Sequence, residues 1–147
     1  MINVKDSTVA LHALLIKDAA LSLLGATIER STRINFDPSR CPWVGVYPGT
    51  VVTTPKLIAA RTWNNAFDLQ VVAQTSSFTD DAEASDLLES MIAAIMDVVD
   101  LNLTLGISGL RVIGFNREYR YVQLDEDGSG SLFMPQAVIR IKIEARN

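Results

Sequence analysis

One stretch largely determines which fold we predict for this sequence. It covers residues 115–146 and reads FNREYRYVQLDEDGSGSLFMPQAVIRIKIEAR. Near its end, apolar residues occupy every second position, at Ala137, Ile139, Ile141, Ile143 and Ala145. This period of two is typical of a strand with one buried face. The first part is rich in aromatic and β-branched residues, which also favour a strand. The Asp and Gly residues between the two parts indicate a turn, so the stretch predicts a β-hairpin.

The same turn matches half of a calcium-binding EF-hand loop. Asp125, Asp127 and Ser129 occupy its first, third and fifth liganding places, and Gly130 occupies the sixth. The twelfth place needs a bidentate carboxylate but holds Gln136, and the flanking segments have the period of strands instead of helices. We therefore favour the hairpin. A calcium-binding module stays as an alternative, and it predicts a calcium-dependent thermal shift that Asp125→Ala and Asp127→Ala would remove.

Two helices are predicted. The first covers residues 6–25, with Asp6 or Ser7 as its cap, no interior Gly or Pro from Val9 to Leu24, and Gly25 at its end.

The second helix follows a cap at Thr79 or Asp80, and Asp80 and Glu83 have capping-box spacing. Acidic residues in its first turns suit the helix dipole. Its apolar residues share one face, namely Leu87, Leu88, Met91, Ile92, Ile95, Met96 and Val99.

The remaining segments indicate strands. Residues 42–48, PWVGVYP, form a short strand, and residues 66–74, AFDLQVVAQ, alternate as a central strand does. The polar segment before them is irregular or forms a short strand around Ile34 to Phe36. Residues 49–65 form either an extended hairpin arm or a long loop. The order helix, strands, helix, strands predicts an α+β fold with an antiparallel (mixed) β-sheet, two α-helices packed on one face and an extended β-hairpin arm. We expect a single domain spanning residues 1–147.

Composition narrows the class of protein. The chain has 147 residues, 48% of them hydrophobic and 20% charged, which is typical of a globular domain. No apolar run approaches the roughly 20 residues of a membrane span, and the N-terminus lacks the layout of a signal peptide. The single cysteine, Cys41, indicates folding in a reducing cytoplasm. A net charge of −4 argues against direct nucleic-acid recognition, although basic residues gather near the C-terminus at Arg117, Arg120, Arg140, Lys142 and Arg146.

No pattern of catalytic residues emerges from the sequence. The only histidine, His12, falls in the first predicted helix, and Cys41 has no evident partner base. There is no zinc-ligand spacing and no Gly-rich phosphate loop. We expect a protein that is not an enzyme and has no metal or cofactor. A small enzyme is the alternative, and it predicts that His12→Ala abolishes an activity.

Aromatic and basic residues suggest an interface with other protein chains. Trp63 lies near Arg61 and Asn64 in the unexplained segment, and Trp and Arg are common interface anchors. Trp63 could equally fold back onto the core. Tyr119 and Arg120 belong to a strand whose two faces are both partly polar, a pattern that a neighbouring subunit can cover. We take these five residues as candidate contacts.

The order of these segments resembles the phage tail terminator (minor tail protein U-like) family of long-tailed phages. The resemblance covers most of the chain. It rests on a Leu-rich N-terminal helix followed by the segment CPWVGVYPGT. An Arg-containing arm then leads into FDLQVVAQTSSFTDDAEASDLLESMIAAIM. LNLTLGISGLRVIGFNREY and AVIRIKIEAR close the domain. Head-tail connector and completion proteins share this order and remain an alternative.

The resemblance implies an assembly role in the virion. Such proteins form a homo-oligomeric ring, usually hexameric, at the head-proximal end of the tail. The ring stops polymerisation of the tail-tube protein and faces the head-tail connector protein, after assembly in the host cytoplasm. Arg61, Trp63, Asn64, Tyr119 and Arg120 would then be candidate subunit or tail-tube contacts. We also expect the arm at residues 49–65 to become ordered only in the assembled ring.

Overall fold

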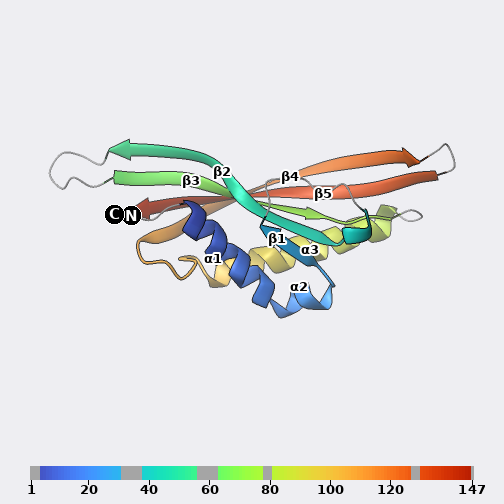
Figure 1. Cartoon of the computed structure of the whole chain (residues 1–147), viewed down its shortest axis with the longest axis horizontal. Coiled ribbons are helices and arrows are strands. Elements are labelled where there is room, and N and C mark those ends of the chain that lie inside the picture. The colour runs from blue at the N-terminus through green and yellow to red at the C-terminus, as the bar shows by residue number, and fades with distance from the viewer. Residues whose placement is uncertain (1–3, 31–37, 56–62, 78–80, 127–129, 147) are drawn as a thin grey trace.

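The protein is an α+β domain in which helices pack against a five-stranded mixed sheet (Figure 1). The computed structural model describes residues 4–30, 38–55, 63–77, 81–126 and 130–146, with side chains described for 4–30, 39–49, 66–77, 81–120 and 132–145. The helices are α1 (Val4–Lys17), α2 (Ala19–Leu23) and α3 (Asp81–Leu101), with a 3-10 turn, η1 (Pro38–Arg40). The strands are β1 (Thr27–Arg30), β2 (Trp43–Pro55), β3 (Trp63–Gln74), β4 (Leu110–Glu126) and β5 (Gly130–Arg146).

The sheet has the strand order β1-β2-β3-β5-β4, so β3 is the central strand, as its alternating residues predict. β1 runs parallel to β2, and the other neighbours are antiparallel. Phe67, Leu69, Val71 and Ala73 of β3 point into the core together with the alternate residues of β5 from Ala137 to Ala145. The period of two is confirmed in both strands because every one of these side chains is buried under the helical layer.

The second predicted helix is confirmed as α3. Leu88, Met91, Ile92, Ile95 and Val99 are buried on its sheet-facing side, and Leu87 and Met96 pack beside them. The predicted caps Thr79 and Asp80 lie outside the described residues. None of the described helices combines the length and apolarity that a membrane span requires.

The first predicted helix is wrong in its bounds, because the chain breaks it at Asp18. Asp18 has an extended backbone, and its carboxylate accepts a hydrogen bond from the Leu21 N–H at 2.9 Å, which starts α2 as a new helix. Helix α1 begins at Val4, so Asp6 and Ser7 lie inside it and are not its cap. Gly25 does follow the helical segment, with a φ of +73° that glycine adopts without strain.

The strand after these helices also differs from the prediction. The residues Ile34–Phe36 lie outside the described part of the chain, whereas Thr27–Arg30 form β1. β1 pairs with the beginning of β2, from Thr27 opposite Trp43 to Arg30 opposite Val46. Its single apolar side chain, Ile28, packs at the margin of the core, which is too little alternation to reveal a strand in the sequence.

Two hairpins extend beyond the helical layer, at opposite ends of the sheet (Figure 1). The β2–β3 hairpin is the arm expected at residues 49–65. Its strands pair as far as Pro55 opposite Trp63, which excludes a long loop over the described part, and β5 supports β3 as far as Asn64. The β4–β5 hairpin is also confirmed. Beyond Gln136, where β3 pairing ends, Thr75 still hydrogen-bonds to Pro135 and Ser77 to Phe133. Among the described residues, the hairpin is therefore two-stranded only in its outer part, residues 124–126 and 130–132. We call this outer part the hairpin tip.

Candidate functional site

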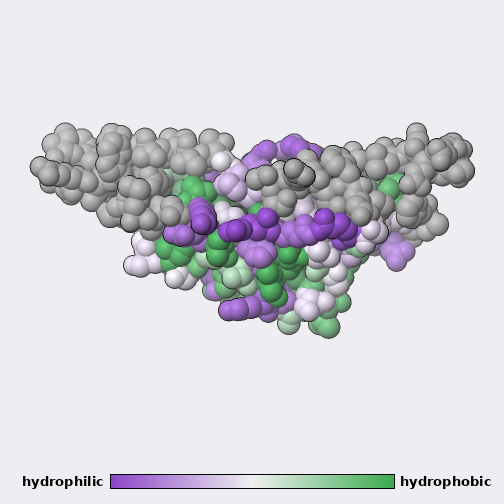
Figure 2. Space-filling model, in the orientation of Figure 1, coloured by the Kyte–Doolittle hydropathy of each residue, from purple (hydrophilic) through white to green (hydrophobic). Residues whose placement is uncertain are grey.

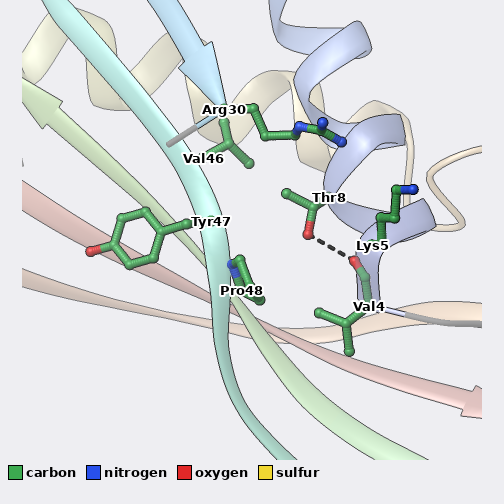
Figure 3. Close-up of a pocket in the computed structure, with 7 residues that line it drawn as sticks. All are labelled: Val4, Lys5, Thr8, Arg30, Val46, Tyr47 and Pro48. Carbon is green, nitrogen blue, oxygen red and sulfur yellow. Dashed lines mark hydrogen bonds between the residues drawn. The ribbon is translucent and has the colours of Figure 1, made fainter. Parts of the chain in front are cut away.

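A pocket of about 410 Å³ lies between the first turns of α1 and the start of β2, where β1 ends (Figure 3). The residues that line it on the side of β2 facing α1 are Val4, Lys5, Thr8, Arg30, Val46 and Pro48. Tyr47 also borders it, but its ring points to the opposite face of β2 (Figure 3). The Thr8 hydroxyl donates to the Val4 carbonyl at 2.7 Å, so that hydroxyl proton is already used within α1. The pocket is therefore an apolar hollow with charges at its rim.

Both charged residues among the described lining of this pocket are positive. Lys5 projects from the first turn of α1, and Arg30 reaches from the last residue of β1 toward the same helix (Figure 3). Both residues are exposed, and neither forms an ion pair with a described carboxylate. This arrangement suits a ligand that carries negative charge beside an apolar group.

The outer face of the sheet, opposite the helices, carries a second cluster of charges. Arg120 Nε lies 3.4 Å from Glu118 Oε1, and Arg140 donates to Glu118 Oε2 at 3.2 Å. The hydrogen bond and charge of Arg120, supported by Arg140, lower the pKa of the Glu118 carboxyl below its ordinary value. Burial raises the pKa of the Tyr47 hydroxyl, while Arg120 and Arg140 oppose that rise. One carboxylate thus faces two guanidinium groups, and this cluster of three side chains has a net positive charge.

Beside these charges, a small apolar cluster lies on the outer face. Trp43, Val72 and Val138 are buried there, with Tyr47 packed against them. The Trp43 indole lies over Gly45, and its N–H donates to Glu29 at 3.2 Å. Glu29 also forms an ion pair with Arg40, the last residue of η1. The hydrophilic residues of this side appear above the centre of the sheet in Figure 2, between the two ends drawn in grey.

Two buried amides border the apolar cluster. Gln74 and Gln136 lie opposite each other on β3 and β5, in the same row across the sheet as Trp43 and Arg120. Both are at least 97% buried, and no described donor reaches the Oε1 atom of either one. Gln136 is the residue at the twelfth place of the calcium-loop pattern. The structure places it inside a strand, far along β5 from the turn.

The predicted contact residues fall into separate regions. Arg61 lies outside the described residues, and Trp63 and Asn64 are described only as strand positions at the beginning of β3. Tyr119 is 46% exposed on the helix-facing side of β4, whereas Arg120 lies on the outer face. On β5, Asn64 pairs with Arg146, whereas Arg120 pairs with Gln136. The start of β3 and the Arg120 region are therefore separated by ten residues of β5, or roughly 30 Å. The structure therefore does not join them into one site.

Sequence reasoning missed the pocket. Lys5 and Arg30 are 25 positions apart and belong to no motif. They come together because α1 packs against β1 and β2, and because β1 ends opposite Val46. No local pattern signals that arrangement.

The residues with catalytic chemistry do not gather around either surface. His12 is partly buried on α1, and Cys41 is partly buried before the cis Cys41–Pro42 peptide. Among the described residues, no group of three His, Cys, Asp or Glu side chains could hold a metal ion. Asp127 and Ser129 of the calcium-loop pattern lie outside the described part.

Comparison with known proteins adds no relative: no protein-family model matches the chain, and no curated protein sequence matches it either.

Proposed function

We propose that this chain is a structural protein of a long-tailed phage. In this proposal it forms a ring of identical copies that caps the tail tube and ends its polymerisation. The observation that carries the proposal is the shape of the sheet. A single domain extends two hairpins in opposite directions, and one of them has a two-stranded tip (Figure 1).

Such hairpins favour contact with other chains. A two-stranded hairpin is marginally stable by itself in water, so its tip gains order when another surface covers it. Within the described residues, β2 beyond Val46 pairs only with β3, and β4 pairs only with β5. Unpaired strand edges are surfaces on which a second chain can add backbone hydrogen bonds.

The opposite directions of the hairpins favour a ring. When one end of a subunit binds a different surface on the next copy, the contact is heterologous, and it closes into a ring if the rotation between copies closes. A closed ring has two unlike faces. One face would bind the last ring of tail-tube protein, and the other would bind the head-tail connector protein.

The resemblance to tail terminators supports this assignment above other ring-forming proteins, with six copies as the expected number. A head-tail completion protein is the second candidate, because the same element order and the same exposed edges suit it. The two differ in partner, since a terminator binds the free end of the tail tube and a completion protein binds the portal side.

Polymerisation of the tail-tube protein encoded in the same genome tests the proposal. We expect the purified chain, added in small amounts, to shorten the tubes seen by negative-stain electron microscopy, with one ring at one end of each tube. Tubes of unchanged length and without terminal rings, together with binding to the connector protein, would favour the completion protein instead.

A further inference from the structure

We infer that the pocket between α1 and β2 receives the acidic β4–β5 hairpin tip of a second copy of this chain. The inference rests on the proposed ring and identifies the two surfaces that meet in it. It assigns a partner to Lys5 and Arg30, which form no ion pair with a described carboxylate.

Charge complementarity selects the occupant. The segment at the hairpin tip reads Leu124-Asp125-Glu126-Asp127, three consecutive acidic residues after an apolar one. Asp125 pairs with Ser131, and Glu126, the last residue of β4, pairs with Gly130, so these two acidic residues lie at the outer end of the hairpin strands. The pocket offers the opposite chemistry, with two cations around the apolar side chains of Val4, Val46 and Pro48.

Backbone geometry supports the same occupant. Within the described residues, β1 pairs with β2 only as far as Arg30 opposite Val46, so the part of the β2 edge that has no described partner begins beside the pocket. A strand that enters the pocket can continue along this edge and add backbone hydrogen bonds. The described residues of the hairpin tip are extended and regularly paired, which is the backbone geometry that strand addition requires.

The positions of the two surfaces make the contact heterologous. The hairpin tip projects beyond the helices at one end of the sheet, and the pocket lies beside the N-terminal turns of α1, away from that end (Figures 1 and 3). Each copy would give its tip to one neighbour and receive the tip of another. This is the arrangement that a ring requires.

Charge reversal on each surface tests the inference. One variant carries Lys5→Glu and Arg30→Glu, and the other carries Asp125→Lys and Asp127→Lys. Lys17→Glu with Arg111→Glu is the matched control, because both residues are exposed cations outside the pocket. Size-exclusion chromatography with light scattering measures the mass of each, and circular dichroism checks that each is folded.

We expect the wild-type chain and the control to elute as the same oligomer, and each reversed variant to elute as the 16.1 kDa monomer. An equal mixture of the two variants should regain the wild-type mass, since the acidic tip of one then meets the basic pocket of the other. Variants that stay oligomeric alone, or a mixture that stays monomeric, would overturn the inference and leave the proposed ring standing. A wild-type chain that never assembles would overturn both.

Discussion

Replacing Gly45 by alanine tests whether the outer face of the sheet is packed as the structure shows. An ideal Cβ atom at Gly45 would lie 2.9 Å from Cζ2 and Cζ3 of Trp43, and closer still to Cη2. Carbon atoms in contact prefer about 3.5–4.0 Å, so the indole ring would have to move. The ring has little freedom, because Trp43 is 1% exposed and its N–H donates to Glu29 at 3.2 Å.

The cost follows from overpacking. Extra atoms forced into a packed site destabilise a protein by about 1–3 kcal/mol. For a chain of this length that corresponds to a loss of roughly 3–10 °C in melting temperature. Moving the indole would also weaken its hydrogen bond to Glu29. Urea unfolding, followed by circular dichroism and by tryptophan fluorescence, measures the change in the free energy of unfolding.

Gly114→Ala is the matched control. Gly114 is also a strand glycine, but no heavy atom of the described residues lies within 4 Å of its ideal Cβ position, and its φ is not in the left-handed region. We expect this variant to match the wild type or gain up to about 1 kcal/mol, since alanine is less flexible than glycine in the unfolded chain. A Gly45→Ala protein as stable as the wild type, or an equal loss in both variants, would refute the packing of Trp43 over Gly45.

Three further outcomes are expected. Asp18→Ala removes the acceptor for the Leu21 N–H and should lower the free energy of unfolding by about 1 kcal/mol, and no loss in a urea titration would contradict the cap. Glu118 should titrate below its ordinary pKa of 4.5, so its contribution to stability is complete above that pH and is lost as the pH falls through the lowered value. Carboxyl NMR should show the Glu118 pKa rising toward 4.5 in Arg120→Ala, and an unmoved pKa would exclude Arg120 as the main cause. If the arm at residues 49–65 orders on assembly, trypsin should cut it in the isolated chain and not in the oligomer, whereas full protection in the isolated chain would reject that idea.

The predicted elements that the structure confirms are those with long, regular periods. The buried face of β5 repeats at every second residue over nine positions, and α3 keeps one apolar face over four turns. In each element, the regular spacing puts the apolar side chains on one face, and that face packs into the same core. Local periodicity is enough to reveal such elements.

The elements that were missed depend on contacts between distant segments. Asp18 is an ordinary residue in a run without Gly or Pro, and its extended backbone and its cap bond to Leu21 appear only in the structure. β1 is a strand because β2 lies beside it, and its four residues have little periodicity of their own.

The candidate site was still less accessible to sequence reasoning. Tyr119 and Arg120 are neighbours in sequence, yet the strand turns them to opposite faces of the sheet. Lys5 and Arg30 are far apart in sequence, yet tertiary packing places them at one pocket. Which charges gather on a surface depends on packing that no short stretch encodes.

The mass of the chain in solution tests the central claim most directly. Sedimentation velocity over a series of concentrations would measure it without any partner protein. The account predicts one species with a mass several times the 16.1 kDa of a single chain, six-fold if the resemblance to tail terminators holds, growing at the expense of the monomer as concentration rises. A folded protein that sediments as a 16.1 kDa monomer at every concentration would contradict it.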